Sequence, residues 1–558
     1  MLLLVTGLMF GDTVGVQGFS DGQRELLDAE SVTGHLLPAG SVFAFLAEHR
    51  QVLFPAEMFT DLFQSGKGRP SVAPDVVASV LVLQALNGLS DRQAAEAVTF
   101  DLRWKAACGF AVTDTSFHPT TLTYWRRRLA ASESPNRIFD AVRGVIKQTG
   151  VIRGKTRRAL DSTVLDDAVA TQDTVTQLVA AIRRVARLVP GAGQVLTGRR
   201  TACDYTRPGK PDIAWDDKAA KAVLIDGLVL DALALLDALT STDTDQVTAE
   251  PTKDAPSDGR GADGQGEADE AGQALALLAL LAGQDVEWID DGAGGGRWRI
   301  AERVARDRII STVDTETRHA HKTRSRKHDG FKAHIAAEPD TGLITNAVVT
   351  KATGQGTGDA AAGAVVLAGD DTVTASIQVL GDSAYGTGDL LVGLHAAGHD
   401  PVIKPWPITP NIPGGFTIDD FTVEHDQFTV TCPAGNTAPF TAKNRTATFG
   451  TACQACPFRD RCTKAVAGRT VTVNVHDKTA REHRARWNTD TAMRADYRTH
   501  RPMVERSIAW LTRGARKLRY RGVAKNDAWL KLRASGINLR QLCTTGLTRT
   551  TGGWQIAT

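Results

Sequence analysis

The chain has 558 residues, of which 42% are hydrophobic, and a formal net charge of +2 at pH 7. This length exceeds what one hydrophobic core usually organises, so we expect one large domain with added modules. No apolar run approaches the roughly 20 residues that a membrane helix needs, which excludes a membrane-spanning protein.

The first predicted module covers residues 1–150 and is helical. Its apolar start, Met1 to Phe10, lacks the basic region and cleavage site of a signal peptide, so we predict a cytoplasmic location. Ser90 to Gln93 has the form of a capping box, which satisfies free amides at a helix start. Helices at about 90–98 and 120–129 could form a DNA-binding unit of the helix-turn-helix type. A plain helical bundle with a basic edge fits equally well. The candidate phosphate contacts are Arg126, Arg127 and Arg128.

The next segment, 151–164, predicts the first strand of a catalytic core. Arg157 to Thr163 is a short apolar stretch that ends in a carboxylate and hydroxyls, as in a buried strand that carries Asp161 at its carboxyl end. A purely structural turn after the strand is the alternative.

From 165 to 310 we predict a helical insertion. Within it, residues 241–272 are rich in Asp, Glu, Gly, Pro, Thr and Ser, which predicts a disordered acidic linker.

The core continues over residues 311–410. The apolar segments 331–338 and 343–350 predict a hairpin. Four elements follow: a helix at 359–367, a buried strand at 376–382 that ends in Asp382, a helix at 389–397 and a strand at 401–404. This order matches a ribonuclease H-like α/β fold, in which a mixed sheet brings carboxylates on neighbouring strands together.

Cysteines crowd into the segment 411–485, which we predict to be a separate cysteine-rich insertion. The four residues are Cys432, Cys453, Cys456 and Cys462. Two cysteines separated by two residues, with two more within reach, can close a tetrahedral thiolate site, which predicts structural Zn²⁺. Four reduced thiols in a small subdomain are the alternative.

The last segment, 486–558, predicts helices of the core. Tyr497, Arg501 and Glu505 follow one another at spacings of four and share one helix face, although Pro502 predicts a kink or a helix start there. Together with Asp161 and Asp382, Glu505 would complete a set of three hard oxygen ligands. Such a set suits two Mg²⁺ (or Mn²⁺) ions that act on a phosphodiester.

Four histidines lie close together in the sequence near the start of the second part of the core. They are His319, His321, His328 and His334. Because they lie among Arg and Lys side chains, we expect phosphate contacts or plain exposure for them rather than metal binding.

The chain carries three acidic blocks in order: Leu160–Thr163, Gly381–Gly386 and Tyr497–Glu505. They resemble the blocks of DDE transposases of bacterial insertion sequences, specifically the eleven-eighty-two family. The resemblance runs from about Phe54 to Leu542, and further matching segments are Gly68–Pro70, Leu89–Arg92, Leu122–Leu129, Ser311–Arg318 and Asp329–His334. Related transposases also carry a cysteine-rich insertion before the helix that bears the Glu.

The resemblance implies roles for single residues. It makes Asp161, Asp382 and Glu505 the metal-binding triad, and it makes Tyr497 and Arg501 the partners of Glu505 near DNA. The family has a Lys seven positions after its Glu, where this chain has Thr512. The basic residues near that position are Arg513 and Lys517.

The resemblance also implies an activity: the enzyme cuts the ends of an insertion sequence and joins the freed 3′ hydroxyl to target DNA. The expected partner is double-stranded DNA, as terminal inverted repeats and as target. A homodimer or larger assembly at the bacterial nucleoid is expected as well. Two alternatives stay open, a ribonuclease H-like nuclease that cuts without joining and an inactive, transposase-derived DNA-binding protein.

Overall fold

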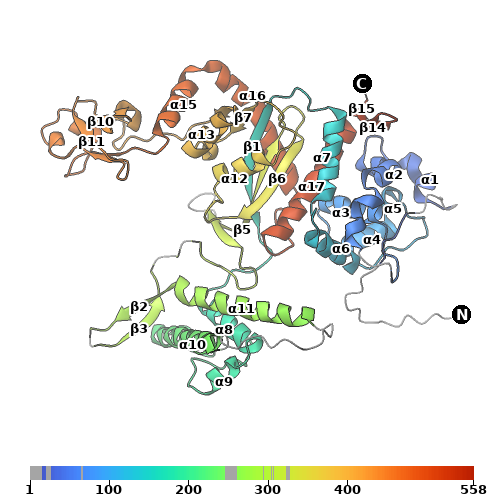
Figure 1. The fold of residues 1–558 in the computed structure, drawn as a ribbon, viewed down its shortest axis with the longest axis horizontal. Helices are drawn as coiled ribbons and strands as arrows, with labels where there is room; N and C mark the ends of the chain where they lie inside the picture. The colour runs from blue at the N-terminus through green and yellow to red at the C-terminus, as the bar shows by residue number, and fades with distance from the viewer. Residues whose placement is uncertain are drawn as a thin grey trace, which may run out of the picture.

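The computed structural model describes residues 16–20, 27–63, 67–245, 261–292, 294–302, 305, 307–321 and 327–557. In Figure 1 a central sheet has a group of small helices on one side, a group of longer helices below it, and a small module of short strands on the other side. The mixed α/β fold class is therefore confirmed.

Six strands form the central sheet: β1 (Arg157–Asp166), β4 (Arg318–His321), β5 (Lys327–Ala337), β6 (Ile344–Lys351), β7 (Gln378–Gly381) and β8 (Asp400–Ile403). Strand β5 runs antiparallel to β1, β4 and β6, whereas β7 runs parallel to both β1 and β8. The pairing of β1 with β7 ends at Ala159, but its pairing with β5 continues to Asp166. The sheet is thus open on the β7 side from Asp161 onward.

Helices cover both faces of this sheet. They are α12 (Asp359–Ala368), α13 (Gly388–Ala396), α16 (Thr491–Thr512) and α17 (Val523–Thr544). Side chains alternate along a strand, so neighbouring residues of β5 pack in different cores. Ile335 packs with Val504 of α16 and Ile537 of α17, whereas Ala336 packs with Val366 of α12. The sheet therefore lies between α12 and α13 on one face and α16 and α17 on the other (Figure 1).

The first part of the chain is helical, as predicted. Its elements are α1 (Ala29–Thr33), η1 (Gly34–Leu36), α2 (Val42–Leu53), η2 (Ala56–Leu62), α3 (Pro74–Asn87), α4 (Asp91–Phe100), α5 (Leu102–Cys108), α6 (Thr120–Ala131) and α7 (Arg137–Thr149). The capping box at Ser90 is formed, because its side chain accepts from the amide of Gln93 and the Gln93 side chain accepts from the amide of Ser90.

The end of the chain joins this helical part. Strands β14 (Leu547–Thr550) and β15 (Gly553–Ile556) form a hairpin, and Trp554 packs on Phe45 of α2 with ring centroids 5.4 Å apart. We predicted helices of the core over 486–558, and this prediction is wrong for the hairpin. Two features account for the difference. The chain turns tightly at 551–552, and the Trp554 side chain packs against the core of the first helices.

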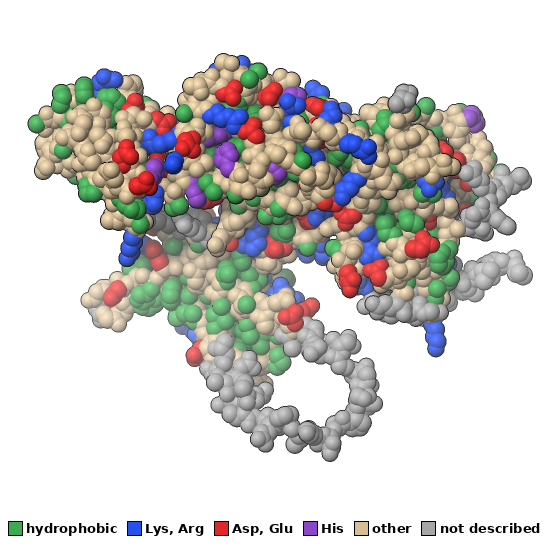
Figure 2. All heavy atoms as spheres, turned by 45° about the horizontal axis from the view of Figure 1, so that its top comes forward, with side chains coloured by type: hydrophobic (Ala, Val, Ile, Leu, Met, Phe, Trp, Pro, Cys, Tyr) green, Lys and Arg blue, Asp and Glu red, His purple; other side chains and the backbone are tan. Residues whose placement is uncertain are grey.

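The insertion after β1 has a core of its own. Its elements are α8 (Thr174–Leu188), α9 (Ala192–Thr197), α10 (Lys218–Asp245), α11 (Gly261–Gln284), β2 (Val286–Asp290) and β3 (Gly296–Ile300). Of the predicted disordered linker, 241–245 and 261–272 are helical, and 246–260 lies outside the described residues. Figure 2 shows apolar side chains gathered on this insertion, where Val223 and Leu280 are exposed.

A small module lies between β8 and α16. It contains η4 (Ile418–Asp420), β9 (Thr422–Glu424), β10 (Thr429–Thr431), β11 (Thr437–Pro439), β12 (Thr446–Thr448), η5 (Gly450–Cys453), α14 (Arg459–Cys462) and β13 (Thr470–Thr472). Phe421, Val430 and Val471 form its centre, so the module packs around its own core. The helix α15 (Asp477–Thr489) then leads back to the central sheet.

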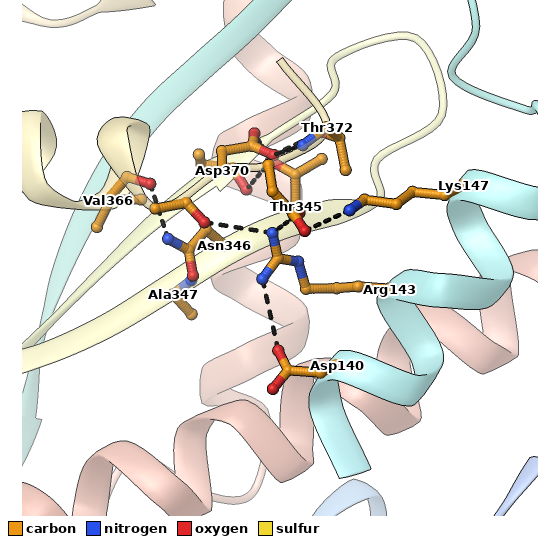
Figure 3. Close-up of polar contacts among 12 residues, drawn as sticks. Asp140, Arg143, Lys147, Thr345, Asn346, Ala347, Val366, Asp370 and Thr372 are labelled. Atoms are coloured by element: carbon orange, nitrogen blue, oxygen red, sulfur yellow. Dashed lines mark hydrogen bonds and ion pairs between the residues drawn. The ribbon is translucent and has the colours of Figure 1, made fainter. Parts of the chain in front are cut away.

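A buried ion pair fixes the turn that follows α12. Arg158 of β1 donates to Asp370 over 2.9 Å, and the two side chains are 1% and 0% exposed. Figure 3 shows Arg143 and Lys147 of α7 pointing toward this turn, where both pair with Asp371. The turn therefore connects α7, the last helix of the first part, to the sheet.

In the described part of the chain, no helix is long and apolar enough to span a membrane.

Candidate active site

Asp161 lies in the middle of β1. We predicted that the strand would end at this residue, and that is wrong, because pairing with β5 carries β1 on to Asp166. The position is nevertheless open on one side, since β7 pairs with β1 only as far as Ala159. Asp161 therefore belongs to a continuous strand and still borders free space at the end of β7.

Asp382 follows β7 directly. It caps the short helix η3 (Ser383–Tyr385), because its carboxylate accepts from the amide of Ala384 over 2.9 Å. Its side chain is 48% exposed. The cap holds Asp382 in place at the sheet edge where Asp161 is open.

Glu505 lies on α16, on the same face as Tyr497 and Arg501. The helix begins at Thr491 and continues through Pro502 to Thr512, so the predicted helix start at Pro502 is wrong. A proline inside a helix removes one hydrogen bond and costs about 3 kcal/mol. Met493 and Val504, on either side of the proline, are both buried in the core of the sheet, and this packing holds the helix together.

Arg501 brings the three carboxylates together. It is 4% exposed, and its Nη2 lies 3.0 Å from Asp161 Oδ1 and 4.0 Å from Asp382 Oδ2. Its Nη1 lies 3.7 Å from Glu505 Oε1. The guanidinium therefore lies among carboxylates that come from a strand, a turn and a helix, as one cation facing three anions.

Burial raises the pKa of Asp161, and the charge of Arg501 only partly offsets this effect. Burial by itself would lower the pKa of Arg501, but the carboxylate of Asp161 reverses the direction, so the pKa of Arg501 is raised. Arg501 therefore favours the charged form of Asp161 against the effect of burial.

The three carboxylates suit a divalent cation. They offer hard oxygen donors, and together they carry more negative charge than Arg501 balances. Among the described residues no three His, Cys, Asp or Glu side chains form a ready-made metal site, and here Arg501 lies between the carboxylates. Asp382 and the 66% exposed Glu505 leave the site accessible from solvent.

The other residues predicted at this site are placed as follows. Tyr497 is half-buried and packs edge-on against Trp487, with centroids 5.2 Å apart. Burial raises its pKa, and the nearby charges of Arg501, Asp382 and Glu505 also act on it. Arg513 and Lys517 are exposed beyond the end of α16 and do not pair with the three carboxylates.

The arginines of α6 have different surroundings. Arg126 forms an ion pair with Asp91 and lies over the ring of Tyr520, 5.2 Å from its centroid. Arg128 lies 4.8 Å from the centroid of Phe63, whereas Arg127 is exposed. The structure thus ties Arg126 to neighbouring helices and leaves Arg127 on the surface, and none of the three contacts Asp161, Asp382 or Glu505.

The four crowded cysteines line a single cavity in the small module. Cys432, Cys453, Cys456 and Cys462 surround it together with Phe421 and Phe449. Burial raises the pKa of the Cys462 thiol, and the three neighbouring thiols raise it further. All four are free thiols. Residues spread over thirty positions thus line one cavity, although among the described residues no three of the thiols are arranged as a ready-made metal site.

The histidines differ from the prediction. His319 pairs with Asp329 over 2.5 Å and His328 with Asp166 over 2.8 Å, so both have carboxylate partners rather than plain exposure. His334 is 1% exposed, and burial lowers its pKa to about 4. Its burial follows from the alternation along β5, which turns it toward α12. The side chain of His321 lies outside the described residues.

Two protein-family models match the chain. The first, a transposase DDE domain, matches residues 431–543, which include Glu505, Arg501 and the four cysteines. The second, a transposase domain known as DUF772, matches residues 32–128, which include α2 to α5 and most of α6. No curated protein and no solved structure gave a match. Each end of the chain is thus similar to a transposase domain.

Proposed function

Because the chain belongs to the DDE transposases of insertion sequences, we propose that it cuts the ends of such an element and joins the freed 3′ hydroxyl to target DNA. The observation that carries this proposal is the convergence of Asp161, Asp382 and Glu505 on Arg501. Three carboxylates from distant parts of a chain gain little stability from such crowding. A metal-dependent reaction on a phosphodiester would explain it, because such a reaction needs several carboxylate ligands at one place.

In this proposal Asp161, Asp382 and Glu505 hold two Mg²⁺ (or Mn²⁺) ions. When bound, such ions activate the attacking oxygen and stabilise the leaving oxygen of a phosphodiester. Asp161 is a fixed ligand on the sheet, and Arg501 favours its charged form against the effect of burial. Asp382 and Glu505 are more exposed and face the solvent from which DNA arrives.

We propose that the DNA is double-stranded, as terminal inverted repeats and as target. Arg513 and Lys517 are exposed beyond Glu505, where the family's Lys is replaced by Thr512. They would contact phosphates, which fix the register of DNA on a protein. Tyr497 would support Glu505 there. On α6 the arginines proposed for end binding are Arg126, Arg127 and Arg128, of which Arg127 is the most exposed.

The proposed architecture follows the strand order. Three antiparallel strands, β6, β5 and β1, followed by the parallel strands β7 and β8, support a ribonuclease H-like core. The membership in the eleven-eighty-two family, the domain boundaries and the assembly of two or more copies at the nucleoid belong to the same proposal.

We also propose that Cys432, Cys453, Cys456 and Cys462 hold one structural Zn²⁺. Elemental analysis of the purified protein is expected to find about one zinc per chain, and Cys456→Ser is expected to lose it, since closed thiolate sites need all four ligands. Cys203→Ser, in the insertion, is the matched control and should keep the metal. If the purified protein contains no zinc and the small module is equally stable without it, the zinc proposal is wrong and the four cysteines are simply reduced thiols.

Cutting and joining of DNA that carries the element's own ends tests the main proposal. With Mg²⁺ present, the native protein should give joined products, and Asp382→Ala should give none. Cut but unjoined DNA would favour a nuclease of the same fold. Tight binding of the ends without cutting, in Mg²⁺ and in Mn²⁺, would favour an inactive DNA-binding protein.

A further inference from the structure

Asp359, which no motif singled out, is the centre of a polar cluster on the far side of β1 from Arg501. It lies in the first turn of α12 and is largely buried, with a side chain that is 16% exposed. Its Oδ1 accepts from Ser162 Oγ over 2.6 Å and lies 2.7 Å from Lys332 Nζ. The Nδ1 of the buried His334 lies 3.6 Å from the same oxygen.

The cluster is connected to Asp161 through one residue. The amide of Ser162 donates to Asp161 Oδ1 over 2.9 Å, while its hydroxyl donates to Asp359. Since side chains alternate along β1, Asp161 points to the α16 face and Ser162 to the α12 face. The strand is therefore held at this position from both faces, by Arg501 on one and by Asp359 on the other.

Helix α12, which carries Asp359, also restrains the turn that carries Asp382. Tyr385, three residues after Asp382, is 1% exposed and packs under α12. A Cβ at Gly363 of α12 would lie 2.8 Å from its ring, so this glycine permits the close approach. The buried hydroxyl of Tyr385 lies near the Ser162 side chain, which acts to lower its pKa. Burial, followed by the charges of Asp359 and Asp161, raises its pKa, which keeps the phenol neutral.

The opposite end of α12 is anchored firmly. The side-chain amide of Asn346 donates to the carbonyl of Val366 over 2.8 Å, and Arg143 donates to the carbonyl of Gly369 over 3.2 Å (Figure 3). The buried pair of Arg158 and Asp370 follows directly. A helix fixed at its end presents its first turn at a defined place, so Asp359 is a rigid support for Ser162.

We propose that Asp359 is a positioning residue of the active site, which orients the Asp161 carboxylate through Ser162 and so sets how the triad receives its metal ions. The proposal rests on the function proposed for Asp161, Asp382 and Glu505. Substitution of a residue that orients a metal-binding group typically lowers metal affinity or activity about 10- to 100-fold. Asp359 contacts none of the reacting atoms and acts only through Ser162.

The test compares Asp359→Asn and Ser162→Ala with the native protein. Both variants are expected to need about 10- to 100-fold more Mn²⁺ for half-maximal binding, measured by calorimetry on the full chain bound to DNA of the element's ends. Ser162→Thr keeps the hydroxyl and should restore native binding, which a merely structural role would not require. Asp389→Asn is the matched control, since Asp389 lies in the first turn of the neighbouring α13 and is 91% exposed.

The outcomes separate this inference from the proposed function. Native Mn²⁺ binding in both variants, or an equal loss in Ser162→Ala and Ser162→Thr, would overturn the inference. A native protein that binds Mn²⁺ without cutting DNA would overturn the proposed reaction and leave the positioning result intact. If the native protein binds no Mn²⁺ at all, both fail. Thermal unfolding of each variant identifies any loss that comes from misfolding.

Discussion

Glu505→Gln is expected to reduce cutting and joining about a thousand-fold, because loss of one carboxylate ligand weakens a metal interaction of about 4 kcal/mol in the transition state. The amide has nearly the shape of the carboxylate, and the Glu505 side chain is 66% exposed, so the fold should be unchanged. Binding of the DNA ends should stay the same or become tighter, since a negative charge near the phosphates is removed. Rates of strand cutting at saturating protein measure the effect.

Glu482→Gln is the control for this experiment. Glu482 is exposed on α15, the helix that precedes α16, and the substitution removes the same charge without touching the three carboxylates. Its rates should equal those of the native protein. If Glu505→Gln cuts DNA at the native rate, Glu505 is not a ligand and the third carboxylate of the site must be sought elsewhere.

Arg158→Met is expected to lower the free energy of unfolding by about 3–5 kcal/mol, because it leaves the carboxylate of Asp370 buried without its cation. The Asp370 side chain is 0% exposed, so water cannot replace the lost cation, and the hydrogen bond that it accepts from Thr345 does not balance its charge. That loss is a large fraction of the about 5–15 kcal/mol by which folded proteins are stable. Urea unfolding followed by tryptophan fluorescence measures it.

The neighbouring Arg157 supplies the control. Its side chain is 28% exposed, donates to Gln378 over 2.9 Å and lies 3.7 Å from Asp496. Arg157→Met should cost no more than about 1 kcal/mol, as is usual for an exposed ion pair. Equal effects of the two substitutions would contradict the assignment of the Arg158 pair as a main support of the sheet.

Several elements follow from local sequence alone. The boundaries of α12, α13 and β8 lie within one or two residues of the prediction, and β5 and β6 form the predicted hairpin, although β5 begins four residues earlier than predicted, at Lys327. The capping box at Ser90 formed as its residues require. These features depend on side-chain periodicity and on turn and cap residues a few positions apart, and such signals are complete within the segment itself. The spacing of Tyr497, Arg501 and Glu505 on one helix is of the same kind.

Other features were decided by contacts between distant segments. Strand β1 continues past Asp161 because β5 pairs with it as far as Asp166, and α16 continues through Pro502 because the sheet holds both of its halves. Local propensity is a weak preference that tertiary packing overrides. The hairpin at the chain end likewise forms where Trp554 covers the first helices.

The sequence by itself therefore determined which residues we propose for the chemistry, since the acidic blocks and the crowded cysteines are visible as patterns. Only the tertiary structure decided how their charges are balanced. It placed Arg501 among three carboxylates, paired Arg126 with Asp91, and brought Asp359 to Ser162. Except for Arg501 and Glu505, which lie four residues apart on α16, the partners in these contacts lie far apart along the chain. Their pairing depends on burial, which removes water and makes a neighbouring opposite charge necessary, and no local pattern records that requirement.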